Sequence, residues 1–136
     1  MASDTDRNRP DRNREVVTRY LEVFRTWDPA QYEVFLTEEP VYRVGQTEHR
    51  GRAGFAQVAR YGAELYPNGT NPEIEAMIAE GDTVAARLVM RAVTNKGEDY
   101  ENTYLLWFEL EDGRIARQWE ILDFRYAAEK FLPPAS

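Results

Sequence analysis

The stretch YENTYLLWFELEDGRIARQWEILD, residues 100–123, decides the fold of this 136-residue chain. Its side chains alternate in character along both halves, with the period of two residues that is typical of β-strands. Asp112-Gly113 between the halves is a strong signal for a tight hairpin turn. The stretch therefore predicts two long antiparallel strands, Tyr100 to Leu110 and Arg114 to Asp123.

More strands are predicted upstream of this hairpin. The period of two continues through Glu73 to Ala79 and Val84 to Val93, and Val41 to Val44 indicates a short strand. Downstream, Tyr126 to Phe131 is long enough for one or two helical turns. The second half of the chain is thus predicted to be an antiparallel meander.

Helical spacing replaces the strand period toward the N-terminus. An apolar stripe begins after Asn13, Asp28-Pro29 starts a short second helix, and Phe55 to Leu65 indicates a third. The first stripe consists of Val16, Tyr20, Val23, Phe24 and Trp27. Helices followed by a meander predict an α+β fold, with N-terminal helices on one face of a curved antiparallel sheet that encloses a pocket.

The length suits one domain with a single core. Residues 1–12 are almost entirely polar, which predicts a disordered N-terminal arm. Residues 13–131 form the predicted domain, and residues 132–136 a C-terminal tail.

Composition excludes several classes of function. A net charge of −7 with dispersed basic residues argues against a nucleic-acid partner. With no cysteine and one histidine, we expect no metal and no cofactor. No apolar run approaches the ~20 residues of a membrane span, and the N-terminus is unlike a signal peptide. We therefore expect a cytoplasmic protein that does not enter a membrane and that binds a small molecule.

Several motifs resemble one known family. Arg19-Tyr20, Gly51-Arg52 and the FELEDGRI hairpin at 108–115, which runs into Trp119-Glu120, are similar to the SnoaL-like polyketide cyclases of the nuclear transport factor 2-like superfamily. The resemblance covers Asn13 to Phe131, and its residues 100–120 look most like the phenazine biosynthesis A/B proteins. It implies a cone-shaped fold with the pocket between the helices and the concave sheet.

The predicted sheet carries apolar residues on both faces, so both faces need cover. The resemblance implies that the inward face includes Asn102, Tyr104, Leu106, Phe108, Arg87, Val89 and Glu120. It implies that the convex face carries a homodimer contact made by Leu88, Met90, Leu105, Trp107, Trp119 and Ile121. The simplest way to cover that face is a second copy of the chain.

Glu120 is the leading candidate for catalysis. A carboxylate on the inward face beneath aromatic helices would be desolvated, and could hold a proton near neutral pH as a general acid or base must. The phenazine proteins carry a functional glutamate at the corresponding place. The alternative is a structural ion pair with Arg87 or Arg91, which would lower the pKa of Glu120 instead.

Arg87 resembles the arginine that epoxide-hydrolase-like members place between two carboxylates. One of those carboxylates corresponds to Val89, so the three-residue arrangement is incomplete. Arg87 would then orient Glu120, hold an anionic substrate group, or serve structure alone.

Tyr20 resembles the oxyanion-hole tyrosine of ketosteroid-isomerase-like members. Leu106 stands where their second acid would be, so steroid isomerisation is not supported, and Tyr20 is equally a core aromatic. Asn102 and Tyr104 are candidate polar groups of the pocket. Its apolar lining is predicted to include Phe24, Trp27, Val58, Val89, Leu106 and Phe108.

Val58 and Gly62 stand where the phenazine proteins have polar residues, so the predicted pocket is less polar than theirs. His49 is predicted in an exposed loop, with a role at the pocket mouth as the alternative.

Two classes of function remain open. One is a cofactor-independent enzyme, a cyclase, condensing enzyme or isomerase acting on a small cyclic or polyketide-like metabolite, with Glu120, Arg87 and Tyr20 as catalytic residues. The other is a non-catalytic small-molecule-binding or accessory protein of the same fold. An epoxide hydrolase with an incomplete triad is a further alternative.

Overall fold

The structure is a computed structural model that describes residues 4–131. Its elements follow the order of helices, a strand pair, a helix and four long strands. They are α1 (Asp4–Leu21), a 3₁₀ turn (Glu22–Arg25), α2 (Pro29–Tyr32), a 3₁₀ turn (Glu33–Phe35), β1 (Leu36–Val44), β2 (Thr47–Arg50), α3 (Gly51–Leu65), β3 (Thr70–Glu80), β4 (Thr83–Val93), β5 (Asp99–Glu111), β6 (Arg114–Leu122) and α4 (Phe124–Phe131). No helix within this range is long and apolar enough to cross a membrane.

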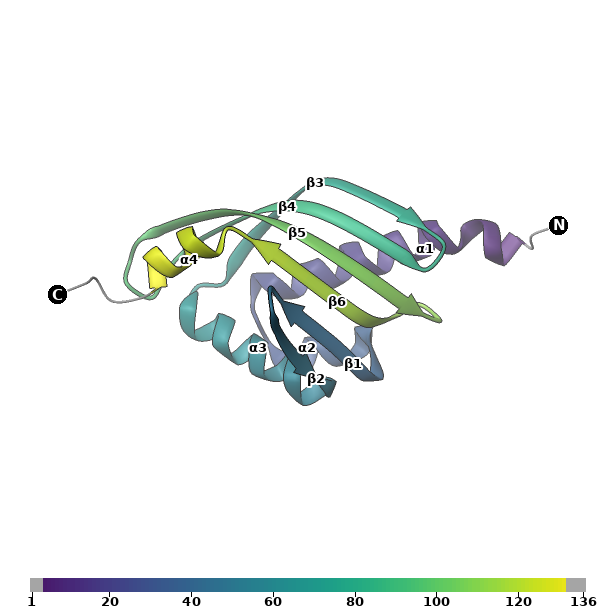
Figure 1. Ribbon diagram of the computed structural model, residues 1–136, viewed down its shortest axis with the longest axis horizontal. Coiled ribbons are helices and arrows are strands. Elements are labelled where there is room, and N and C mark those ends of the chain that lie inside the picture. Colours follow the sequence, from purple (N-terminus) through teal and green to yellow (C-terminus); the bar gives the residue numbers. More distant parts are fainter. Residues whose placement is uncertain (1–3, 132–136) are drawn as a thin grey trace.

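The six strands form one curved sheet in the order β2-β1-β6-β5-β4-β3. Figure 1 shows the four long strands arching together, with α1 passing behind them and α3 below. Neighbouring strands are antiparallel except for β1 and β6, which run parallel. The α+β fold is therefore confirmed, but the sheet is mixed rather than wholly antiparallel. Sequence periodicity carries no information on which strand pairs with β1.

The hairpin between β5 and β6 is confirmed. Asp112 and Gly113 adopt positive φ angles of 49° and 77°, as a type I′ turn requires at both central residues. This turn matches the twist of the strands and sets Trp107 opposite Trp119 and Leu106 opposite Glu120. The hairpin register thus decides which side chains reach the inner face.

The N-terminal segment differs from expectation. Helix α1 begins at Asp4, so residues 4–12 are helical where the sequence predicts a disordered arm. The Asn13 side chain is buried and donates to the Gly81 carbonyl and the Asp82 carboxylate, both at 3.2 Å. Arg9 adds an ion pair to Asp82 at 3.5 Å. The turn between β3 and β4 therefore holds this helix, a contact that its polar composition does not reveal. Residues 1–3 of the predicted arm and the tail at 132–136 lie outside the described residues.

Strand β4 presents the opposite face from the one predicted. Leu88 and Met90 are fully buried on the inner side, and Arg87 lies outward, opposite Leu105 of β5. Because side chains alternate, an error of one residue exchanges every side chain between the faces. Burying the apolar set Val84, Ala86, Leu88 and Met90 is more favourable than burying two arginines.

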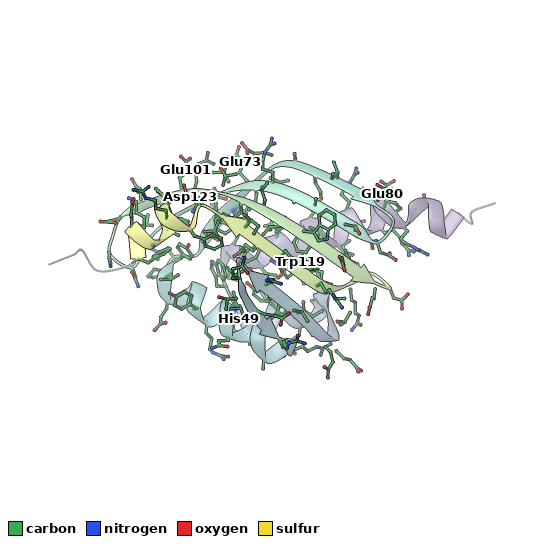
Figure 2. The ribbon with its side chains drawn as sticks, in the orientation of Figure 1. His49, Glu73, Glu80, Glu101, Trp119 and Asp123 are labelled. Carbon is green, nitrogen blue, oxygen red and sulfur yellow. The ribbon has the colours of Figure 1, made fainter. Side chains whose placement is uncertain are left out.

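Ion pairs confirm the outward position of the β4 arginines. Arg87 is paired with Glu75 at 3.4 Å with 54% of its side chain exposed. Arg91 is paired with Glu73 and Glu101, which lie together at the upper edge of the sheet in Figure 2. Arg87 and Val89 are thus removed from the inner face, and Arg87 cannot be a partner of Glu120.

An aromatic cluster fills the narrow part of the cone. The Tyr20 ring meets Phe24, Tyr32, Phe35 and Phe108 edge to face, with centroid distances of 5.6–5.8 Å. Helix α2 begins after Asp28 as predicted, and the Asp28 side chain caps it by accepting a hydrogen bond from Ala30 N at 3.0 Å. Large rings from helices and sheet therefore build the core in which the site lies.

Trp27 and Gly62 fit closely together beside this core. Trp27 has a φ of 56°, stacks on Tyr66 with centroids 5.8 Å apart, and donates to Thr70 Oγ1 at 3.2 Å. A Cβ built on Gly62 would lie 2.1 Å from the Trp27 ring. Helix α3 can therefore approach Trp27 only where it carries glycine.

We predict that Gly62→Ala destabilises the fold by about 1–3 kcal/mol, because the added methyl group forces Trp27 out of position. Urea unfolding followed by far-UV circular dichroism measures this change. Arg60→Ala, at an exposed position of the same helix, should cost less than about 0.5 kcal/mol. Equal effects of the two substitutions would contradict the close fit.

Candidate functional site

A cavity of about 940 Å³ opens beside the aromatic core. Its walls come from α3, α4, the turn between β1 and β2, and the inner faces of β5 and β6. The described lining is Trp27, Val44, Gly45, Gln46, Thr47, His49, Gln57, Val58, Tyr61, Gly62, Leu65, Tyr66, Tyr100, Tyr104, Glu120, Ile121, Leu122, Phe124, Ala127, Ala128 and Phe131. A cavity of this size and apolar character is typical of small-molecule sites.

Glu120 lies at the buried part of this lining, with 6% of its surface exposed. Burial raises its pKa from 4.5 to about 7, and the hydrogen bond from Tyr42 opposes part of that rise. Arg87 and Arg91 point to the outer face, so the predicted structural ion pair with either does not form. The carboxyl group is thus close to half protonated at neutral pH.

Tyr42 is a site residue that the sequence reasoning missed. Its hydroxyl donates to Glu120 Oε1 at 2.7 Å, and its side chain is fully buried. Strand β1 delivers it through the parallel pairing with β6, which sets Tyr42 opposite Gln118 and Val44 opposite Glu120. No local pattern links two residues 78 positions apart. The one signal for Tyr42 in the sequence was the alternation of side chains along β1, which places Tyr42 on the inner face.

Gln118 continues this network behind Glu120. Tyr20 donates from its hydroxyl to Gln118 Oε1 at 2.5 Å. The Gln118 Nε2 and the Tyr32 hydroxyl are buried and make no hydrogen bond within residues 4–131. Burial and the charge of Glu120 both raise the pKa of Tyr32, so its hydroxyl stays protonated. Tyr20 is therefore a core residue that supports the strand carrying Glu120 and does not line the cavity.

Three tyrosine hydroxyls gather at another part of the lining. The hydroxyls of Tyr100 and Tyr104 are 2.9 Å apart, and Asn102 Nδ2 donates to the Tyr100 hydroxyl at 3.0 Å. The Tyr66 hydroxyl interacts with both tyrosines, and burial raises its pKa. We call Tyr66, Tyr100 and Tyr104 the tyrosine cluster. Sequence reasoning proposed Tyr104 but missed Tyr66 and Tyr100. Tyr100 lies at the start of β5, just after the turn from β4.

The other predicted site residues divide into three groups. Trp27, Val58, Tyr104 and Glu120 line the cavity. Phe24, Leu106 and Phe108 are buried in the core beside it, and Asn102 holds Tyr100 from behind. Arg87 and Val89 are on the outer face, so the predicted catalytic role of Arg87 has no structural basis.

His49 is half-buried in the lining rather than in an exposed loop. Figure 2 shows it at the lower side of the molecule, on β2 and next to α3. Its ring centroid is 6.5 Å from that of Tyr42.

The described lining contains neither a lysine nor an arginine, and Glu120 is its one carboxylate. Within residues 4–131, no three histidine, aspartate or glutamate side chains converge in a way that could hold a metal ion. The arrangement suits proton transfer to and from a bound apolar compound.

We predict that Glu120 makes the stability of the protein depend on pH. The unfolded chain loses this proton near pH 4.5 and the folded chain near pH 7, so stability should fall as pH rises through that window, by about 3 kcal/mol in total. Urea unfolding at pH values from 4.5 to 8 should show this slope as a difference between wild type and Glu120→Gln. A pH-independent difference would contradict the raised pKa.

Comparisons with known proteins agree with this architecture. The SnoaL-like domain family matches residues 17–118, which are 102 of the 136 residues. No curated protein matches the sequence.

Solved structures share the fold at low sequence identity. An NTF2-like protein of unknown function from Burkholderia pseudomallei has a TM-score of 0.81 at 12% identity, over 90% of this chain and 98% of that one. A phenazine biosynthesis-related protein from Pseudomonas aeruginosa has a TM-score of 0.80 at 18% identity, over 100% and 90%. An LEH-like epoxide hydrolase from Mycobacterium tuberculosis has a TM-score of 0.74 at 20% identity, over 91% and 92%. From its curved sheet, its enclosed cavity and the match over residues 17–118, this chain belongs to the SnoaL-like domain family and has the nuclear transport factor 2-like fold.

Proposed function

We propose that this protein is a cofactor-independent acid–base enzyme that acts on a small cyclic or polyketide-like metabolite. One observation carries the proposal: Glu120 is buried in the lining of a large cavity, with a pKa raised to about 7 and a hydrogen bond from Tyr42. A general acid or base works best when its pKa lies near the working pH. Cyclisation, condensation and isomerisation all require such a group.

The surroundings of Glu120 support a role in moving protons. Tyr42 fixes one carboxyl oxygen, and the pKa of Tyr42 is raised by burial and by the charge of Glu120, so its hydroxyl remains a donor. Glu120 would take a proton from the substrate and return it to a second position.

The shape and chemistry of the cavity indicate the substrate. Aromatic walls from Trp27, Tyr66, Tyr100 and Phe131 suit a flat ring compound. The SnoaL-like family membership supports the same class of ligand. An enzyme that removes a proton next to a ring carbonyl fits these walls.

We predict that Glu120→Gln lowers catalysed proton exchange by about 10²–10⁴-fold. The measurement is deuterium incorporation into 2-tetralone in D₂O, followed by proton NMR, over a range of pH. Wild-type exchange should rise as Glu120 ionises, with a midpoint near pH 7.

Glu48→Gln is the matched control, because Glu48 is exposed on β2 and paired with Arg50 outside the cavity. It should exchange like wild type. Equal rates for wild type and Glu120→Gln would overturn the proposal.

A non-catalytic binding protein is the second candidate. The observation that favours it is that Glu120 is the one carboxylate of the described lining, without the second acid or the arginine of a multi-residue site. Such a protein would bind ring compounds in the cavity, and neither wild type nor Glu120→Gln would accelerate exchange.

Epoxide hydrolysis by a carboxylate–arginine–carboxylate arrangement has no support from the geometry. Arg87 points to the outer face and pairs with Glu75, and Val89 lies on that face as well. The shared fold with the epoxide hydrolase therefore does not carry over to its chemistry.

We also propose that the protein forms a homodimer through its convex face. Four large apolar side chains are exposed there: Ile78 (70%), Leu105 (52%), Ile121 (49%) and Trp107 (46%). Figure 2 shows Trp119 on β6 in the same region of the sheet. These residues surround a hollow of about 360 Å³. A self-complementary apolar patch of this kind is the usual basis of a two-fold dimer.

We predict a dimeric mass for the wild type at micromolar concentration, measured by light scattering after size exclusion. Trp107→Arg should shift the protein to a monomer with an unchanged circular dichroism spectrum, because it places a charge at the centre of the patch. Arg114→Ala, in the β5–β6 hairpin and away from the hollow, should stay dimeric. A monomeric wild type would count against the proposal.

A further inference from the structure

The tyrosine cluster is a group of hydrogen-bond donors that the proposed proton transfer does not use. Tyr66, Tyr100 and Tyr104 all line the cavity, and each is at most 5% exposed. Burial raises the pKa values of all three, so each hydroxyl keeps its proton through the physiological range. The cluster can therefore donate hydrogen bonds, and it cannot supply a negative charge.

The network behind the cluster orients these donors. Asn102 donates to the Tyr100 hydroxyl at 3.0 Å, and Asn102 is itself held by the backbone of Asp123 at 3.1 and 3.3 Å. The Tyr100 and Tyr104 hydroxyls share a hydrogen bond of 2.9 Å, in which either can be the donor. The hydroxyls can turn about their C–O bonds, so an acceptor in the cavity can receive a hydrogen bond from the cluster in exchange for one within it.

Charge in the cavity favours a neutral acceptor. The described lining holds no lysine or arginine, and Glu120 becomes negative above pH 7. Two cations on neighbouring elements are engaged elsewhere: Arg43 donates to the Gly45 carbonyl at 3.2 Å, and Lys130 lies 5.6 Å from the Tyr126 ring centroid. A buried carboxylate or phosphate of a ligand would find no lysine or arginine to pair with, at a large cost in free energy.

We propose that Tyr66, Tyr100 and Tyr104 form a subsite for a carbonyl oxygen, and that the cavity selects neutral ring ketones or esters over carboxylates of the same shape. The catalytic role of the subsite rests on the proposed function. Binding of a ligand to the subsite can be measured without turnover. The acceptor is a carbonyl because it offers two lone pairs and no proton, which suits hydroxyls that keep their protons and can donate.

The subsite and Glu120 together define a reaction step. The charge of Glu120 acts on all three tyrosines, so the two groups share one electrostatic environment. With a ketone bound, Glu120 takes the proton from the carbon next to the carbonyl. The C–H electron pair forms a carbon–carbon double bond, and the carbonyl π pair moves to the oxygen, which the tyrosine hydroxyls stabilise by hydrogen bonding. Return of the proton from Glu120 balances the step.

Three probes of matched shape test the subsite. They are 2-acetylnaphthalene, 2-isopropenylnaphthalene, in which a methylene group replaces the oxygen, and the anion 2-naphthoate. Isothermal titration calorimetry at pH 8 should show the ketone binding about five- to tenfold more tightly than the alkene, and at least about tenfold more tightly than the anion. The carbonyl stretch of the bound ketone should shift to lower frequency.

Variants locate the effect. Tyr104→Phe and Tyr66→Phe should each reduce the ketone-to-alkene affinity ratio toward one and diminish the carbonyl shift, while alkene binding stays as in wild type. Tyr61→Phe removes a hydroxyl from the exposed rim of the cavity and should keep the wild-type ratio. Two separate variants keep the test valid if one of them does not fold.

Equal binding of ketone and alkene, tighter binding of naphthoate, or no binding of any probe would overturn the subsite. Its failure is distinguishable from failure of the proposed function. A ketone-to-alkene affinity ratio of one, together with loss of deuterium exchange in Glu120→Gln, removes the subsite and keeps the acid–base role. A high ketone-to-alkene affinity ratio, together with exchange that Glu120→Gln does not change, keeps the subsite and removes the acid–base role.

Discussion

The parallel pairing of β1 with β6 is the constraint on which the site depends. It brings the Tyr42 hydroxyl to 2.7 Å from Glu120 and lets Gly45 N donate to the Glu120 carbonyl at 3.0 Å. It also carries β2 and His49 to the wall of the cavity. Without this pairing Glu120 would face solvent at the sheet edge, and its pKa would return toward 4.5.

Aromatic packing then sets the size of the cavity. Aromatic rings pack edge to face around Tyr20, and Trp27, held by its bond to Thr70 and by its fit against Gly62, lies between this core and the cavity. The core packs closely on one side of Glu120 and the cavity opens on the other, so Glu120 is buried yet accessible to a ligand. The packing of the core thus contributes to the burial that raises the pKa of Glu120.

Much of this could be predicted from the sequence, and the failures share a cause. The hairpin at Asp112-Gly113 and the helical stripe through Tyr20 follow from local periods and turn chemistry, and the family resemblance implied the inward position of Glu120. The face of β4 does not, because valine occurs on both of its faces and only burial in the assembled sheet selects one. The removal of Arg87 from the site follows from that single choice.

The sequence by itself determined the class of fold and the order of its elements, since these depend on residues that are neighbours along the chain, and its resemblance to a known family pointed to the buried carboxylate. Tertiary structure alone decided what surrounds that carboxylate. Tyr42 meets Glu120 across 78 positions, and Tyr66 reaches Tyr100 and Tyr104 from a different element. Hydrogen bonds between distant residues leave no periodic trace in a sequence, because each depends on strand pairing and helix packing that only the folded chain establishes.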